Sequence, residues 1–276
     1  QAEDGIRDRS PSRGLGDVYK RQASIISSAR INKTKLREID KDYRPVEESE
    51  SYRIQNLVKY QMSKKGFGIQ VGYKIGCTTP VMQKYLNIHN PCAGVIFEST
   101  VHKNFGQTKH TDYQYPGVEC EIAVSLTKDM NKKDSLYTET SVVEHVAAVM
   151  AAIEIVDDRW NDYHSVSTPS LIADNFFGAG CVLGNKIETS GLNLNSIQGS
   201  MKINNEIVGQ GTGKDIMGNP FKALAWLANL NINLGTPLKS GDFVLLGSIV
   251  ETKWVNKGDL VEIDIDKLGR ASIEFN

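Results

Sequence analysis

Hydrophobic positions recur at helical spacing in the first quarter of the chain, from about residue 23 to residue 65. The segment VEESESYRIQNLVKYQMSKKG has a period close to 3.6 residues, with apolar positions at Tyr52, Ile54, Leu57, Val58 and Met62. The pattern stops at Gly66, and glycine commonly follows the last turn of a helix. This pattern predicts a helical N-terminal portion.

Shorter elements follow this helical portion. FGIQVGYKIGCTTP, bounded by glycines and by Pro80, is typical of a strand, and PCAGVIFEST is typical of a second extended piece. Between them, TPVMQKYLNI predicts a short helix. We therefore expect the helical portion to lead into a β-rich body.

The segment SVVEHVAAVMAAIEIV predicts a helix that gives way to a strand. Ser141 and Glu144 have the spacing of a capping box, which satisfies free backbone N–H groups at a helix start. One helical face then carries the apolar residues Val142, Val146, Val149 and Met150. Because β-branched residues take over near Ile153, we expect the strand to begin there.

The last third of the chain predicts one helix and several strands. NPFKALAWLANL has Asn219 as N-cap and Pro220 at the first helical position. From residue 241 onward, short alternating segments are separated by turns at NKGD and KLGR. The whole pattern predicts an α+β domain.

Composition excludes several classes of protein. The chain has 276 residues, 40% hydrophobic and 24% charged, with a formal net charge of -1, so it has no charge excess for binding nucleic acid or an anionic membrane. No apolar run reaches the length of a membrane helix, which is about 18 residues. The four cysteines form no CxxC pair and are typical of free thiols in a reducing compartment. We expect a soluble, cytoplasmic protein.

Residues 1–22 differ from the remainder. QAEDGIRDRSPSRGLGDVYKRQ begins without methionine and has no helical or strand period, as in a disordered arm. It also resembles translated sequencing-adapter sequence, so we treat residues 1–22 as a non-native or disordered extension and 23–276 as a single domain. The natural N-terminus is then expected to be missing. A natural basic arm is the alternative.

Candidate chemistry begins with GVECEIAV, residues 117–124. Glu119 and Glu121 stand two positions apart in an apolar run, so they point to the same face of a strand. Two carboxylates so close repel each other unless a cation neutralises them. Glu154, in AAIEIVDDRW, is a third acid in an apolar run. Three carboxylates could bind a divalent cation such as Mg²⁺. The alternatives are a solvated strand face for Glu119 and Glu121 and a strand-edge acid for Glu154.

Five motifs, in order, resemble the 2-keto-4-pentenoate hydratase group of the fumarylacetoacetate hydrolase superfamily, which also contains 4-oxalocrotonate decarboxylases. The motifs are GYKIGCT, GVECEIAV, AAIEIVDDRW, IADNFFGAG and GNPFKALAWLANL. The similarity runs from about Ile54 to the C-terminus. It implies a mixed β-roll or sandwich body of the fumarylacetoacetate hydrolase type, with Mg²⁺ or Mn²⁺ held by Glu119, Glu121 and Glu154. It also implies a homo-oligomer.

The resemblance further implies a metal-dependent lyase that adds water to 2-hydroxydienoates or 2-oxo-alkenoates, such as 2-keto-4-pentenoate, in aromatic catabolism. Lys74 matches a lysine implicated in substrate binding and proton transfer; a solvated strand lysine is the alternative. Asp174 is a candidate general acid/base and Asn175 an orienting group, whereas an Asx-turn would explain both. Arg159 could bind a second carboxylate or pair with Asp157 or Asp158.

One position departs from the family pattern. Members of this group carry Ala-Ser after the Asp-Asn pair, where this chain has Phe176 and Phe177. We expect the aromatic pair to reshape the pocket, with Phe177 at the substrate. A 2-oxo-3-enedioate decarboxylase stays open, with Arg159 or Lys253 as the cation for the distal carboxylate. An acylpyruvate hydrolase and a catalytically silent binding protein are further alternatives.

Overall fold

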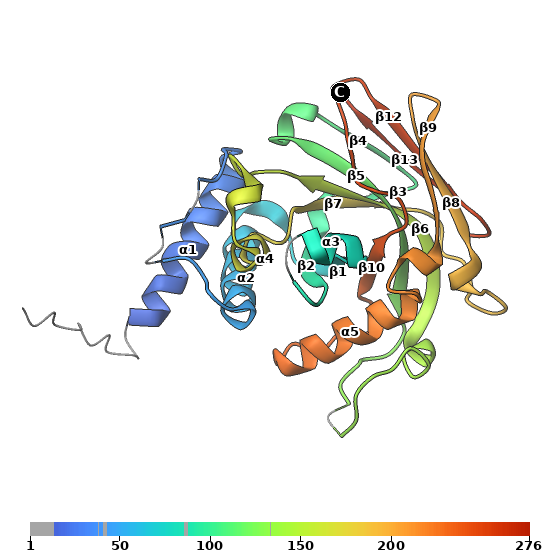
Figure 1. Ribbon diagram of the computed structural model, residues 1–276, viewed down its shortest axis with the longest axis horizontal. Coiled ribbons are helices and arrows are strands. Elements are labelled where there is room, and N and C mark those ends of the chain that lie inside the picture. Colours follow the sequence, from blue (N-terminus) through green and yellow to red (C-terminus); the bar gives the residue numbers. More distant parts are fainter. Residues whose placement is uncertain (1–13, 38, 41–42, 86–87, 133) are drawn as a thin grey trace, which may run out of the picture.

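The computed structural model describes residues 14–37, 39–40, 43–85, 88–132 and 134–276. Its helices are α1 Gly14–Ile31, α2 Glu48–Met62, α3 Pro80–Tyr85, α4 Thr168–Ala173 and α5 Pro220–Asn233. In Figure 1, α1, α2 and α4 gather on one side of the molecule, and α5 lies below β10. Among the described residues, no helix has both the length and the apolar character needed to cross a membrane.

Within these described ranges, thirteen strands form one mixed sheet. They run in the order β2-β1-β10-β5-β6-β7-β3-β4-β13-β12-β8-β9, with β11 paired to β5. The strands are β1 Gln70–Gly76, β2 Cys92–Phe97, β3 Val101–Lys103, β4 Phe105–Thr108, β5 Pro116–Leu126, β6 Val146–Asp157, β7 Gly178–Leu183, β8 Gln198–Ile203, β9 Glu206–Thr212, β10 Phe243–Ser248, β11 Lys253–Trp254, β12 Leu260–Ile265 and β13 Gly269–Phe275.

The first six strands of this order curl into a partly closed barrel, which we call the β2–β7 barrel. Neighbouring strands lie about 4.8 Å apart, so β1 and β6 would be far apart in a flat sheet. Instead, Lys74 on β1 lies 3.0 Å from Glu154 on β6. The edge strands β2 and β7 also contact each other. The curl therefore brings residues from distant strands into one interior.

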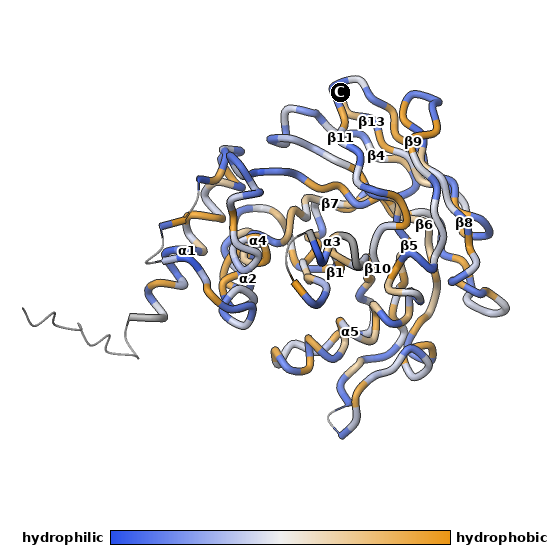
Figure 2. Tube along the Cα trace, viewed as in Figure 1, coloured by the Kyte–Doolittle hydropathy of each residue, from blue (hydrophilic) through white to orange (hydrophobic). Residues whose placement is uncertain are grey.

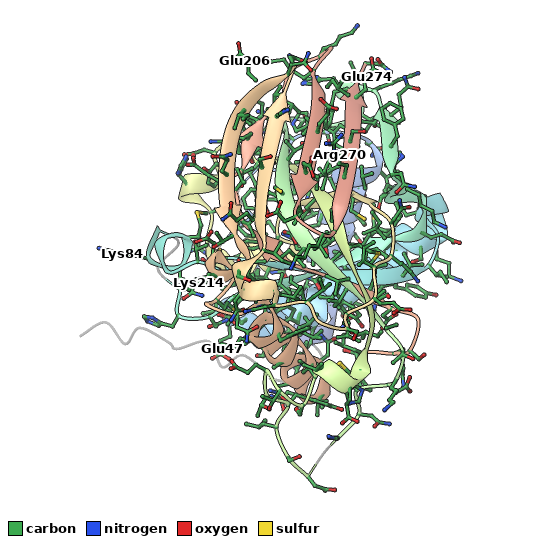
Figure 3. All side chains as sticks on the ribbon, turned by 90° about the vertical axis from the view of Figure 1, so that its right-hand side faces the viewer. Glu47, Lys84, Glu206, Lys214, Arg270 and Glu274 are labelled. Carbon is green, nitrogen blue, oxygen red and sulfur yellow. The ribbon has the colours of Figure 1, made fainter. Side chains whose placement is uncertain are left out.

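The remaining strands fold back over β6 and β7, where β12 and β13 make contact. Buried residues alternate with accessible ones along β13, as expected for a strand with one face against a core. Figure 3, turned towards this side, shows Glu206 on β9 and Arg270 on β13, both of them exposed. The α+β fold with a layered β body is thus confirmed.

Helix α5 packs against β10 with one face. Hydrophobic and hydrophilic stretches alternate along it in Figure 2, as expected for such a helix. Asn219 caps it as expected, accepting a 3.0 Å hydrogen bond from the backbone N–H of Phe221. The expected helix before Gly66 is α2, and the C-terminal strands are β10 to β13.

The prediction of a helix that begins at Ser141 is wrong. A short 3-10 turn covers Val143–His145, and β6 begins at Val146 rather than near Ile153. The hydroxyl oxygens of Ser141 and Thr138 each accept a hydrogen bond from the other residue's backbone N–H. Ser141 therefore belongs to a local turn and does not cap a helix. Strand β6 is buried on both faces for most of its length, and a run of buried apolar residues also matches a helical period.

At the N-terminus, α1 begins at Gly14. Residues 14–22 are therefore helical, although their sequence lacks a helical period, and Gln22 is buried. Residues 1–13 lie outside the described part of the chain. The domain boundary at residue 23 and the non-native origin of residues 1–22 stay predictions.

Candidate metal centre and active site

Three carboxylates meet inside the β2–β7 barrel. Strands β5 and β6 pair in antiparallel register with Glu119 opposite Glu154, and Glu121 follows on the same face of β5. One oxygen or more from each acid lies within 4.8 Å of the others. The structure therefore brings together the three glutamates that the sequence analysis named as metal ligands.

Burial makes this cluster electrostatically unfavourable by itself. Glu121 and Glu154 are 0% and 1% exposed. Burial, together with the neighbouring glutamates, raises the pKa of Glu121 well above its usual range. Burial is also the main cause that raises the pKa of Glu154 to about 7; Lys74 opposes this rise and Glu119 adds to it. Without a cation, part of the cluster therefore holds protons.

The hydrogen bonds of the cluster leave acceptors free. The backbone N–H of Gly247 donates to Oε2 of Glu121 at 2.9 Å, and Thr252 donates its hydroxyl to Glu119. Among the described residues, Oε1 of Glu121 and Oε2 of Glu154 have no hydrogen-bond partner. Buried acceptors without partners are costly, so these oxygens fit a bound cation.

Charge and ligand type agree with a divalent ion. Three ionised glutamates and one lysine leave two negative charges, which one divalent cation would balance. A set of carboxylate oxygens suits hard cations such as Mg²⁺ and Mn²⁺. The residues present therefore fit the expected metal.

Lys74 is the cation of the site. It lies on β1, is 2% exposed, and places Nζ 3.0 Å from Oε1 of Glu154. Burial alone would lower its pKa, but the attraction of Glu154, Glu119 and Glu121 outweighs burial and raises the pKa. Lys74 therefore holds its proton at neutral pH and is not the solvated strand lysine of the alternative interpretation.

Asp174 and Arg159 pair with each other. Asp174 ends α4 and is 1% exposed; Nε of Arg159 lies 3.1 Å from its Oδ2, and Nη1 of Arg30 lies 3.2 Å from its Oδ1. Arg159 also donates to the backbone oxygens of Asp174 and Phe177, at 3.0 and 3.3 Å. Both side chains thus stabilise the turn after α4, and their proposed roles at the substrate stay predictions.

Asn175 joins the two edges of the barrel. Its Oδ1 accepts from the backbone N–H of Val95 on β2 at 2.7 Å, and its Nδ2 donates to the Val95 oxygen at 2.9 Å. The side chain imitates a neighbouring strand where β2 has no strand partner on that side. Gly94 leaves room for this contact, since a Cβ there would lie 3.0 Å from Asn175 Oδ1.

The rings of Phe176 and Phe177 contact each other edge-on, with centroids 5.6 Å apart, but their other neighbours differ. Residues 175–177 all have positive φ, at 63°, 43° and 62°. The Phe176 ring centroid lies 5.1 Å from Nζ of Lys74, inside the barrel. Phe177 instead packs edge-on against Tyr163, with ring centroids 5.4 Å apart. Of the two, Phe176 is therefore the one beside the candidate active site.

Sequence reasoning missed Arg30, Gly247 and Thr252. Arg30 reaches from α1 to the turn after α4, donating to the backbone oxygens of Asp174 and Gly178 at 3.1 and 3.0 Å. In the sequence, an arginine in the last turn of a helix looks like any solvent-exposed arginine, so nothing marked Arg30 as part of the site. Gly247, at φ 126°, lies at a bulge in β10, where its N–H turns towards Glu121. A lone glycine in a strand could have signalled that bulge.

Two pockets lie near the barrel. One opens between β2 and β7, lined by Arg30, Phe67 and Asn175 among others, and reaches Glu154. The other lies between α2, β1, β2 and the end of α5, and contains Lys59 and Tyr73. Tyr73 and Lys74 project to opposite faces of β1, so the second pocket does not belong to the carboxylate site.

Comparisons with known proteins agree with this geometry. The family model "Fumarylacetoacetate (FAA) hydrolase C-terminal" matches residues 87–275. A 2-keto-4-pentenoate hydratase of Burkholderia vietnamiensis is 32% identical over 226 residues, which cover 82% of this chain and 85% of that protein. A 2-hydroxyhexa-2,4-dienoate hydratase of Comamonas testosteroni is 31% identical over 74% of this chain and 78% of that one.

Among solved structures, 4-oxalocrotonate decarboxylase from Pseudomonas putida G7, complexed with magnesium and adipate, superposes with a TM-score of 0.88. The match covers 95% of this chain and 98% of that one, at 22% identity. At this identity, the match supports a shared fold and nothing further. The fold, the ordered motifs and the matched relatives place this chain in the 2-keto-4-pentenoate hydratase and 4-oxalocrotonate decarboxylase group of the fumarylacetoacetate hydrolase superfamily.

Proposed function

We propose that this protein is a metal-dependent hydro-lyase that adds water to 2-hydroxydienoic or 2-oxo-alkenoic acids such as 2-keto-4-pentenoate. The observation that carries the proposal is the enclosed cluster of Glu119, Glu121 and Glu154 with Lys74 ion-paired to it. The hydratases among its relatives, at about 30% identity over most of the chain, support the same chemistry.

We propose Mg²⁺ or Mn²⁺ as the cofactor, held by the three glutamates. The similar decarboxylase has been seen with magnesium and with calcium, which supports a divalent ion of this kind. When bound, the ion would supply Lewis-acid stabilisation for negative charge that develops on the 2-oxo group. Gly247 and Thr252 would orient two of the ligands through their hydrogen bonds.

Lys74 is the proposed proton-transfer residue. A 2-hydroxydienoate becomes a 2-oxo-3-enoate when the hydroxyl proton leaves and a proton is added at the far carbon, C5. Water then adds at C4. Because its pKa is raised, Lys74 carries a proton to donate, and the neighbouring carboxylates stabilise the charged form.

The decarboxylase alternative needs a cation for a second carboxylate. Arg159 pairs with Asp174, which Arg30 also contacts, and Lys253 lies 3.1 Å from the exposed Glu251. Neither residue that the sequence offered for this role is therefore free beside Lys74. This favours the hydratase, while the likeness to a decarboxylase keeps the alternative worth testing.

The test is an ultraviolet assay of the metal-loaded protein. Dienoates and dienedioates would be followed by loss of absorbance, with CO2 detected in parallel. We expect a metal-dependent loss of absorbance without release of CO2. Glu121→Gln should show no loss of absorbance, whereas the matched control Glu206→Gln, at an exposed glutamate, should behave like the wild type. Release of CO2 would assign the decarboxylase instead, and metal binding without any turnover would assign a silent binding protein.

Assembly as a homo-oligomer and a cytoplasmic location complete the proposal. Substrate-binding roles for Asn175, Arg159 and Phe177, and a catalytic role for Asp174, stay predictions of the sequence. Their contacts with backbone and with one another support a positioning role for all four.

A further inference from the structure

We propose that Phe176 determines the substrate class of this site by forming an apolar wall beside Lys74, so that the enzyme selects 2-oxo monoacids with a short apolar end and rejects longer chains and diacids. This inference rests on the proposed function and deepens it. It concerns the end of the substrate away from the metal.

The backbone holds the Phe176 ring inside the barrel. Phe176 is 5% exposed, and its ring occupies the space left by Gly76 on β1, where a Cβ would lie 2.6 Å from a ring carbon. On one side of it, Asn175 is bonded to β2. On the other, Arg30 and Arg159 hold the backbone oxygens of Gly178 and Phe177. Because the backbone is held on both sides of Phe176, the ring has little freedom to move aside.

The chemistry places the far end of the substrate against this ring. An acid whose C1 and C2 oxygens bind the ion that the three glutamates would hold must present C5 to Lys74 in the proposed proton transfer. The ring centroid of Phe176 lies 5.1 Å from the same Nζ atom. Substituents at and beyond C5 therefore meet the ring of Phe176.

A phenyl ring offers no hydrogen-bond donor to a carboxylate. A second carboxylate at this position would lose its hydration without a replacement, and burying such a charge unpaired is strongly unfavourable. Arg30 lines the pocket that reaches Glu154, but its guanidinium and that of Arg159 are both ion-paired with Asp174. An uncharged, short end is the group that this wall accepts.

Phe105 supplies the matched control. It is the same residue type, but it lies on β4, outside the barrel, and is 51% exposed. Phe177 is unsuitable, because its ring packs edge-on against the ring of Phe176, with centroids 5.6 Å apart. Removing the ring of Phe105 should not change which acids bind.

The experiment measures binding of saturated 2-oxo acids, which cannot undergo the hydration, to the Mg²⁺-loaded protein by calorimetry. The ligands are pyruvate, 2-oxopentanoate, 2-oxohexanoate and 2-oxoadipate. We expect Phe176→Ala to raise the affinity for 2-oxohexanoate relative to pyruvate by about tenfold or more, the scale of a changed hydrophobic subsite. The affinity for 2-oxoadipate should stay low, because alanine offers its second carboxylate no donor either. Phe176→Leu should give a smaller change, and Phe105→Ala none.

Two results would overturn the inference. One is an unchanged affinity ratio in both Phe176 variants while pyruvate and Mg²⁺ still bind. The other is an equal change in Phe105→Ala. Failure of the proposed function has a different signature, because the wild-type protein would then bind Mg²⁺ but no 2-oxo acid, pyruvate included. The Leu variant keeps the test decisive if Phe176→Ala does not fold.

Discussion

At the scale of single residues, the notable feature is that two buried glutamates hold oxygens without a hydrogen-bond partner in the described part of the chain. Glu121 and Glu154 are each buried beside further negative charge, which raises the pKa of both. Such an arrangement destabilises the ionised protein unless a cation neutralises it. The cost is consistent with a site that is completed by a metal.

The first prediction concerns pH. Because the pKa of Glu154 rises from the model-peptide value of 4.5 to about 7, the folded metal-free protein binds more protons than the unfolded chain between these values. The contribution of Glu154 to stability is therefore fully present below about pH 4.5 and is lost as pH rises through about 7. Urea unfolding at several pH values measures this.

Glu154→Gln is the comparison for that experiment, since it cannot titrate. Its free energy of unfolding should fall less than that of the wild type between pH 5 and 8. At saturating Mg²⁺, the free energy of unfolding of the wild type should depend on pH no more than that of Glu154→Gln, because the ion takes the place of the proton. Parallel pH profiles for the two metal-free proteins would contradict the prediction.

The second prediction concerns Lys74. Lys74→Met should lower kcat by about 10²–10⁴-fold, the usual contribution of a proton-transfer group. It should not weaken Mg²⁺ binding, because it removes a positive charge beside the three glutamates. Steady-state kinetics and a metal titration measure the two effects. Lys59→Met, at a half-buried lysine in the other pocket, is the control and should leave kcat unchanged.

At the scale of elements, the turn after α4 connects three parts of the fold. Arg30 approaches it from α1, Arg159 from the end of β6, and β2 is bonded to it through Asn175. Three consecutive residues with positive φ are strained unless their surroundings hold them. The hydrogen bonds of these side chains supply that restraint, and Phe176 is thereby held beside Lys74.

Asn175 gives the third prediction. Asn175→Ala leaves the backbone N–H and oxygen of Val95 without their side-chain partners and should lower the free energy of unfolding by about 2–5 kcal/mol. Chemical denaturation measures the change. Asn205→Ala is the control, since Asn205 also has positive φ but is exposed, and it should cost about 1 kcal/mol. Equal losses would show that backbone strain alone explains both.

At the scale of the whole molecule, the curl of the sheet creates the site. Strands β5 and β6 supply the carboxylates, β1 supplies the lysine, and β10 supplies the Gly247 N–H. These residues are spread over more than half of the chain. Binding of a metal should therefore stabilise the folded chain as a unit rather than one segment.

The fourth prediction follows from that linkage. Mg²⁺ at 100 times its dissociation constant should stabilise the protein by about 2.7 kcal/mol and raise its melting temperature, and a chelator should reverse the change. Glu121→Gln should show almost no shift with Mg²⁺, whereas Glu206→Gln should behave like the wild type. Differential scanning calorimetry measures all three proteins. An equal shift in Glu121→Gln would place the ion elsewhere.

The sequence alone was sufficient for the acid pair on β5, the third glutamate and most of the elements. Alternation along a strand puts Glu119 and Glu121 on one face whatever the surrounding fold, and α5 carries its own cap and first-turn proline. Local signals of this kind depend on neighbours in sequence. The error at residues 141–152 shows their limit, because burial on both faces of β6 removes the alternation that identifies a strand.

Only the tertiary structure decided which polar residues belong together. No local pattern distinguishes Arg30 from a solvated arginine, or separates Phe176, beside Lys74, from Phe177, packed on Tyr163. Those relations depend on the curl that brings β1 to β6 and on the turn that joins β2 to β7. Contacts between residues 80 or 144 positions apart, such as Asn175 with Val95 and Arg30 with Asp174, arise from packing of the whole chain, which no short stretch of sequence encodes.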